Sequence, residues 1–315
     1  MGLVPAGFIA IPPGPASGFD HADVYLGAEP PLLYVAHTGA DRVDVIDCVT
    51  NTFVRSLPDH PGVAGILVDN PGGLLFTSDR AAARVSIYRC PGERLVGRIT
   101  VGDRPNGLAY DAQRHRLFSF NLGEPIGENC TASVVDLGDA EVGEAEEVGE
   151  AEVVATIPLP GRPRWAVFDP ASDRIFANIA NPAQIAVIDP VSLRIGRVIE
   201  VPAAGPHGLW VRGGRLYCAA DGRVLVVLRS DTGAVIAEVP LPGVPDVVMF
   251  DSGTDHLYVA VGDPGVVCVI DAVLPARIET VPTGPGAHTI AVEPRSHTLY
   301  AFLPAAMGAS VFVDR

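Results

Sequence analysis

LLYVAHTGADRVDVIDCVTNTFVRSLP, residues 32–58, is the stretch of sequence that decides the fold. It contains three short apolar or alternating runs, LLYVAH, RVDVID and FVRSLP, which are separated by segments containing Gly, Asp or Asn. Runs of this length, rich in Val, Ile and Tyr and bounded by turn-forming residues, are typical of β-strands. The stretch therefore predicts three consecutive strands of one antiparallel sheet.

The same pattern recurs along the whole chain. The first run has counterparts in LLFTSD, RLFSFN, RIFANI, RLYCAA, HLYVAV and TLYAFL, and each is preceded by a further apolar run, such as GVAGILVD or RPNGLAYD. The residues that enter these preceding runs are 42 positions apart from Ala64 to Asn106, and 43 apart from Arg164 to His207. Four short strands in a unit of about 40–45 residues are the signature of a β-propeller blade.

The number of repeats predicts how the ring closes. Seven Tyr/Phe-containing strands can be counted, but the chain ends at VFVDR, directly after the third strand of the last unit. GFIAIPPG, residues 7–14, has the pattern of an outer strand and leads into FDHADVYL, residues 19–26, which fits the first inner strand. We therefore expect one all-β domain over residues 1–315. It is a seven-bladed β-propeller with four antiparallel strands per blade, and the N-terminal strand completes the last blade.

The repeated phrasing YVA-x-TG, VxVID, TN-x-V and IP resembles the YVTN-type repeat of seven-bladed β-propellers. The resemblance is best at residues 32–58, 174–202 and 256–282, and it extends over essentially the whole chain. It implies the fold, because the repeated residues pack sheets and shape turns, and it implies little about function. Propellers similar in architecture include streptogramin lyase, lactonases and cyclases of biosynthetic pathways.

Composition narrows the classes of function. The chain has 34 Gly and 29 Pro among 315 residues, a net charge of −15, and no lysine. A lysine Schiff base is thereby excluded, and the charge argues against nucleic acid or an anionic membrane as a partner. The five cysteines have no CxxC spacing, so neither a disulfide framework nor a zinc motif is indicated. No signal peptide is evident, and we expect a cytoplasmic protein.

One unit is longer than the others. Asn106 and Arg164 are 58 positions apart, and the excess maps to GDAEVGEAEEVGEAEVV, residues 138–154, which holds seven acidic residues and no basic one. We expect a solvated low-complexity loop in the third blade, with a cation or partner site as the alternative.

The first strand of every propeller blade lines the central channel, so the residue that enters each of these strands is a candidate site residue. These positions are His21, Ala64, Asn106, Arg164, His207, Asp246 and His288. A structural repeat needs only small or compatible residues here, whereas this set is rich in titratable groups. Blades five, six, seven and one are consecutive around the closed ring, so we expect His207, Asp246, His288 and His21 to converge.

Three interpretations of this ring remain open. It is a hydrogen-bonded polar ring filled by water, or a metal site built on His21, His207 and His288. In the third interpretation it is an acid–base site in which His207, His288, His21 and Asp246 are catalytic, while Arg164 and Asn106 bind an anionic oxygen of the substrate.

Further residues could extend such a site. His37 and Asn121 end the second strands of their blades and could rim a mouth of the channel, while Trp165 and Trp210 lie in inner strands and could form an apolar wall. Nucleotide-binding and nucleophile-elbow motifs are absent from the sequence, so no cofactor is predicted, and a divalent metal is the alternative.

We therefore expect a cofactor-independent enzyme of the lyase, isomerase or cyclase type, acting on a small natural-product-like molecule. The alternatives are a non-catalytic binding or scaffold propeller and a metal-assisted lactonase or other hydrolase.

Overall fold

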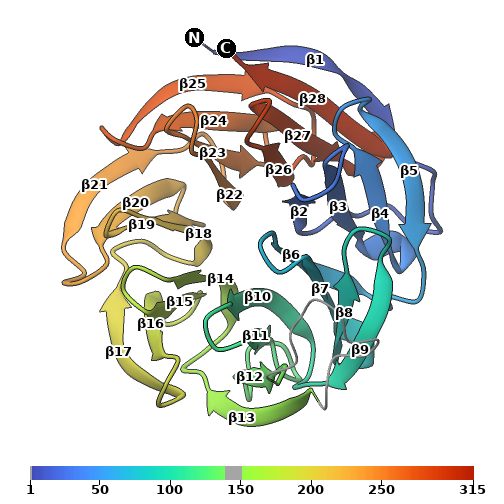
Figure 1. Ribbon diagram of the computed structural model, residues 1–315. Coiled ribbons are helices and arrows are strands. Elements are labelled where there is room, and N and C mark those ends of the chain that lie inside the picture. The colour runs from blue at the N-terminus through green and yellow to red at the C-terminus, as the bar shows by residue number, and fades with distance from the viewer. Residues whose placement is uncertain (1, 139–150) are drawn as a thin grey trace.

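The computed structural model describes residues 2–138 and 151–315, which form seven four-stranded antiparallel sheets around a central channel (Figure 1). This arrangement confirms the predicted all-β, seven-bladed β-propeller.

The blades follow one another along the chain, and the strands of each are given from the channel outward. Blade 1 holds β2 (Ala22–Tyr25), β3 (Leu32–His37), β4 (Arg42–Asp47) and β5 (Thr52–Leu57). Blade 2 holds β6 (Val63–Asp69), β7 (Leu74–Asp79), β8 (Arg84–Arg89) and β9 (Arg94–Thr100). Blade 3 holds β10 (Pro105–Asp111), β11 (Arg116–Asn121), β12 (Thr131–Asp136) and β13 (Glu152–Pro158). Blade 4 holds β14 (Pro163–Asp169), β15 (Arg174–Ile179), β16 (Gln184–Asp189) and β17 (Arg194–Glu200).

The remaining blades have the same order. Blade 5 holds β18 (Pro206–Arg212), β19 (Arg215–Ala220), β20 (Val224–Arg229) and β21 (Val235–Pro240). Blade 6 holds β22 (Pro245–Asp251), β23 (His256–Val261), β24 (Val266–Asp271) and β25 (Ala276–Pro282). Blade 7 holds β26 (Thr289–Glu293), β27 (Thr298–Leu303), β28 (Gly308–Asp314) and the N-terminal β1 (Leu3–Ala10). The described residues also form three short 3₁₀ helices after second strands: η1 (Thr38–Ala40), η2 (Arg80–Ala82) and η3 (Pro304–Ala306).

The N-terminal strand closes the ring, as the repeat count predicts. β1 pairs antiparallel with β28, with Leu3 opposite Asp314 and Ala10 opposite Gly308, and the two termini lie side by side at the rim (Figure 1). The strand lies four residues earlier than the expected 7–14, because Pro12 and Pro13 cannot supply ladder N–H groups. Pro5 is accommodated at an irregularity in the register between Pro5 and Gly7.

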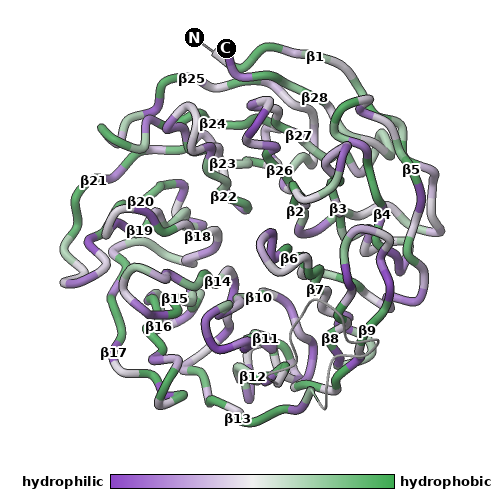
Figure 2. Tube along the Cα trace, viewed as in Figure 1, coloured by the Kyte–Doolittle hydropathy of each residue, from purple (hydrophilic) through white to green (hydrophobic). Residues whose placement is uncertain are grey.

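Hydrophobic contacts between neighbouring blades form the core. Tyr34 and Val45 of blade 1, for example, share a buried cluster with Val68 and Leu75 of blade 2. Figure 2 shows hydrophobic residues along the strands and hydrophilic residues gathered at the turns. Because each blade packs on the next, the ring is rigid and holds the inner strands at fixed distances from the channel axis.

The acidic insertion lies mostly outside the described residues, which omit 139–150; its last residues, from Glu152 onward, belong to β13. All five cysteines are buried and free. Within the described ranges we find no helix with the length and apolar character needed to cross a bilayer.

Candidate functional site in the central channel

The two ends of the channel differ, because all the inner strands begin at one end and finish at the other. We call the end where the inner strands begin the first mouth, and the end where they finish the second mouth. In blades 2 to 6 the inner strand carries a register irregularity near its start, for example between Pro163 and Ala166 and between Pro206 and Leu209. A bulge of this kind releases its residues from the ladder and re-aims their side chains. Arg164 and His207 lie within such bulges, at the first mouth.

An ion cluster surrounds His207 at this mouth. Its Nδ1 is 3.0 Å from Asp221 Oδ1, and its Nε2 is 3.1 Å from Asp246 Oδ1. Burial alone would lower the pKa of His207, but Asp246 and Asp221 outweigh it and raise the pKa to about 9. His207 is therefore a cation at neutral pH and cannot accept a proton there. Asp221 has no counterpart in the predicted set, because it lies in the turn after β19 rather than at an inner-strand start.

Asp246, one of the two carboxylate partners of His207, is ionised at neutral pH. Burial would raise the pKa of Asp246, but the positive charge and hydrogen bond of His207 outweigh that effect and lower it. His288 and His21 act on Asp246 in the same direction. The four residues predicted to converge thus do lie around one end of the channel.

Arg164 and Asn106 are drawn into the same end by other contacts. Arg164 Nη2 is 3.6 Å from Asp221 Oδ2, which attracts it, while its Nη1 lies 3.0 Å from Nε2 of the His207 cation, which cannot accept a hydrogen bond from it. The Asn106 side-chain oxygen accepts a hydrogen bond from Arg80, whose Nη2 is also 2.8 Å from Asp20 Oδ2. Arg80 and Asp20 were not predicted, because neither opens an inner strand.

His288 faces backbone rather than a carboxylate. Its Nδ1 is 2.8 Å from the carbonyl oxygen of Gly286, and its Nε2 is 3.0 Å from that of Phe19. It lines a shallow surface pocket of about 350 Å³ together with His207 and Asp246. The contacts with two carbonyl groups fix the ring and tie blade 7 to the segment before blade 1.

A larger cavity occupies the channel itself. It has a volume of about 500 Å³ and is lined by the inner strands of blades 1 to 6. Its apolar wall includes Ile66, Leu108, Trp165, Phe168, Trp210 and Met249. Because the lining extends to the ends of these strands at Asp69 and Asp169, the cavity reaches toward the second mouth. Its size and character suit a small, largely apolar organic molecule.

His21 links the first mouth to this cavity. The side chain lines the cavity and lies against Trp165, with ring centroids 4.1 Å apart, while its Nε2 is 3.4 Å from Asp20 Oδ1. Burial lowers the pKa of His21 below its ordinary value of 6.5, although Asp20 opposes the shift. Unlike His207, this imidazole is neutral at pH 7 and able to accept a proton.

Asp23 is the cavity residue that sequence reasoning missed. It lies on β2, two positions after His21, which directly precedes that strand, and both side chains line the cavity. Burial raises the pKa of Asp23 to about 6, against the opposing effect of hydrogen bonds from the backbone N–H groups of Val68 and Val24. The alternation of β-strand side chains could have pointed to it, since residue i+2 shares the face of residue i.

His37 and Asn121 lie away from the channel cavity and are fully buried within their blades. His37 Nδ1 is 2.7 Å from Asp44 Oδ2, while the Asn121 amide donates to the hydroxyls of Thr131 and Ser133. Their burial leaves no path to a substrate, so the geometry does not support the expectation that they bind one.

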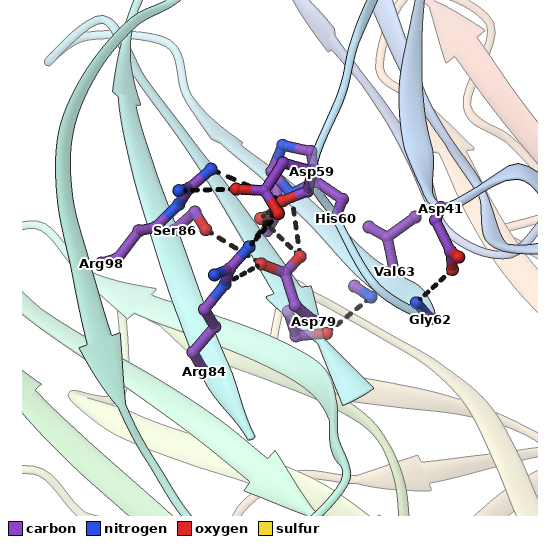
Figure 3. Close-up of polar contacts among 12 residues, drawn as sticks. Asp41, Asp59, His60, Gly62, Val63, Asp79, Arg84, Ser86 and Arg98 are labelled. Carbon is purple, nitrogen blue, oxygen red and sulfur yellow. Dashed lines mark hydrogen bonds and ion pairs between the residues drawn. The ribbon is translucent and has the colours of Figure 1, made fainter. Parts of the chain in front are cut away.

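A related network in blade 2 shows what such buried groups do (Figure 3). His60 Nδ1 is 2.8 Å from Asp79 Oδ1, and Asp79 also accepts hydrogen bonds from Arg84 and Ser86. The other ring nitrogen of His60 is 2.8 Å from the hydroxyl of Tyr88. These contacts join the loop before β6 to strands β7 and β8, so the network stabilises the blade.

The predicted metal set does not assemble in the parts of the chain that the structure describes. No group of three or more His, Cys, Asp or Glu side chains within residues 2–138 and 151–315 is arranged to hold a metal ion. His21, His207 and His288 each contact a different partner: Asp20, a pair of carboxylates, and two backbone carbonyls.

Comparison with known proteins supports the fold alone. No family model and no curated protein matches the sequence. Among solved structures, the chain is similar to Kuenenia stuttgartiensis hydrazine synthase, with a TM-score of 0.79 and 16% identity over 95% of this chain and 96% of that one. It is also similar to a chain of a mitotic checkpoint complex, with a TM-score of 0.79 and 12% identity over 99% of this chain and 92% of that one. At such identities the likeness defines the class of protein, a seven-bladed β-propeller, and nothing finer.

Proposed function

We propose that this propeller is an enzyme that binds a small, largely apolar organic molecule in the channel cavity and moves protons on it. The reaction class is elimination, isomerisation or ring formation, without a cofactor. The observation that supports it is the pair His21 and Asp23, two ionisable side chains facing one apolar cavity, where burial lowers the pKa of His21 and raises that of Asp23 to about 6.

The two groups have complementary roles in this proposal. His21 is neutral at pH 7 and acts as the base, accepting a proton from a carbon or hydroxyl of the substrate. Asp23, with a pKa of about 6, retains a minor protonated fraction and returns a proton to a second position. Proton transfer by a positioned side chain contributes about 10²–10⁴-fold to a rate, which sets the size of the effect to look for.

The ion cluster at the first mouth supports this chemistry without touching the substrate. Asp246 and Asp20 favour the cationic form of His21 that would follow proton transfer, while His207 and Arg80 oppose it. His207 and Asp246 are therefore assigned a positioning role, and the catalytic role moves to His21 and Asp23.

We also propose that the chain belongs with the YVTN-type propellers. The motif residues coincide with repeated structural positions: YVA lies on β3, VDVID on β4, and Asn51 of the TN pair has a φ of 53° in the turn before β5. An alignment of homologues tests this, since the same turn residues should then recur blade by blade.

A binding or scaffold propeller is the alternative function. It is favoured by exposed apolar side chains on the outer strands, such as Phe8 on β1 and Ile278 on β25. A propeller of this kind would use its rim, and substitutions in the channel cavity would leave partner binding unchanged.

The test uses the two tryptophans that line the cavity. Small cyclic ketones, lactones and hydroxy acids are screened by Trp fluorescence, and those that bind are incubated in D₂O, where proton transfer leaves deuterium at the reacting carbon. We expect incorporation by the wild type, and a loss of about 100-fold or more in His21→Gln and Asp23→Asn. His115→Gln, in a turn outside the channel cavity, is the matched control. Equal rates in wild type and both cavity variants, or no binding to the cavity, would contradict the proposal.

A further inference from the structure

Three arginine side chains at the first mouth have N–H groups without a hydrogen-bond acceptor. Arg80 belongs to η2, Arg162 to the loop before β14, and Arg164 to β14. The Nε of each is buried and has no hydrogen-bond acceptor among the described residues. Buried donors of this kind are costly unless they are satisfied, so three in one place indicate a missing acceptor.

The arginines are close enough to affect one another. Burial lowers the pKa of Arg162, and the positive charges of Arg164 and Arg80 lower it further. Arg80 is paired with Asp20, and Arg164 approaches Asp221. Arg162, by contrast, makes no hydrogen bond or ion pair through its side chain with any part of the chain that the structure describes.

The charges of the residues in these contacts do not balance. The three arginines and the protonated His207 are four cations, while Asp20, Asp221 and Asp246 are three anions. Within this set one positive charge remains uncompensated, in a protein whose net charge is −15. A local excess of the opposite sign is unexpected unless something anionic neutralises it.

We propose that Arg80, Arg162 and Arg164 form a binding site for one carboxylate-bearing small molecule at the first mouth of the channel. The planar guanidinium fork matches a carboxylate, and a single negative charge cancels the excess. A phosphate dianion fits less well, because its second charge would face Asp20 and Asp221. The site does not depend on the proposed function, since none of these arginines lines the channel cavity.

The experiment follows the thermal stability of the whole protein in sodium acetate, with inorganic phosphate and chloride as comparison anions at the same ionic strength. A ligand that binds only the native state stabilises it, and saturation at about 100 times Kd should raise Tm by about 4 °C. We expect acetate to raise Tm saturably in the wild type and chloride to do so less. A larger effect of phosphate than of acetate would assign the site to phosphate esters and overturn the carboxylate assignment.

Arg162→Gln is the decisive variant, because the Arg162 side chain makes no hydrogen bond or ion pair within the described residues and is attracted by Asp221 only at longer range. It should abolish the response to acetate, and without added anion its Tm should equal or exceed that of the wild type. Arg174→Gln is the matched control. Arg174 begins β15 and is paired with Asp189, and this variant should respond to acetate like the wild type. Equal responses to all anions, or an undiminished response in Arg162→Gln, would overturn the site.

Discussion

The imidazole of His21 lies against the indole of Trp165, with ring centroids 4.1 Å apart and planes inclined by 41°. One residue precedes the first inner strand and the other lies in the fourth, so the contact spans the channel between β2 and β14. It closes the inner end of the apolar cavity, with the ion cluster of the first mouth beyond it. The contact also gives His21 a spectroscopic reporter.

Protonation of His21 should quench the fluorescence of Trp165. Because burial lowers the pKa of His21, we expect the quenching midpoint below pH 6.5. The measurement uses Trp210→Phe, in which Trp165 is the sole tryptophan, titrated from pH 8 to 4. The same titration in Trp210→Phe/His21→Gln should lack this transition, and a midpoint at or above 6.5 would contradict a buried, neutral imidazole.

Asp23→Asn should stabilise the protein at neutral pH. The pKa of Asp23 rises to about 6 on folding from an ordinary value of 3.8, so the native state binds the extra proton and loses stability as pH rises from about 4 to 6. At pH 7 the charged form costs up to about 3 kcal/mol, which the amide avoids. The amide oxygen keeps only one of the two backbone hydrogen bonds, because Val24 and Val68 donate to different carboxylate oxygens, and this loss of about 1 kcal/mol offsets part of the gain. Urea unfolding at pH 7 and pH 4 measures this. The gain should shrink at pH 4, and a loss at pH 7 would show that the carboxylate is stabilising.

His207 should stabilise the protein at neutral pH and lose that effect in alkali. Its pKa rises to about 9 from an ordinary value of 6.5, so its contribution is fully present below pH 6.5 and disappears as pH rises through 9. The free energy of unfolding of the wild type relative to His207→Gln should therefore fall by about 3 kcal/mol between pH 6.5 and 9.5. Taking the difference cancels other titrating groups. A difference that does not change with pH would mean that His207 is not paired with Asp246 and Asp221.

Asp79→Ala should be among the most destabilising substitutions in the chain. It leaves His60, Arg84 and Ser86 without their shared acceptor inside blade 2 (Figure 3). Removing one partner of a buried ionic network costs about 3–5 kcal/mol. Asp47→Ala, which removes a partly exposed turn acceptor, is the control and should cost far less. Similar urea midpoints for the two variants would show that the network around Asp79 does not stabilise blade 2.

Removing β1 should open the ring. The strand supplies the outer edge of blade 7 and buries Leu3 and Ile9, so a chain starting at residue 12 exposes the unpaired edge of β28. We expect a lower Tm and concentration-dependent association, followed by calorimetry and light scattering. Phe8→Ser, at a side chain that is 52% exposed on the same strand, should leave both unchanged. A truncated protein that stays monomeric at the wild-type Tm would contradict closure by β1.

The fold could be predicted because the evidence for it is local and repeated. Each blade carries its own alternation and turn residues, as in the stretch 32–58, and seven copies of one pattern leave few architectures that bury every strand. The position of the ring residues followed as well, since a repeat places Arg164, His207 and Asp246 at equivalent points of their blades.

The chemistry of those residues was decided by tertiary structure. His21 and His207 have equivalent places in the repeat, yet their pKa values move in opposite directions. His207 is flanked by Asp221 and Asp246, while His21 is buried against Trp165 at the cavity. Ionisation depends on desolvation and on charges within a few ångströms. Asp246 and Trp165 come from other blades, and Asp221 comes from a different strand end of the same blade. The sequence determined where the side chains would gather, and only the closed ring determined which of them carries a charge.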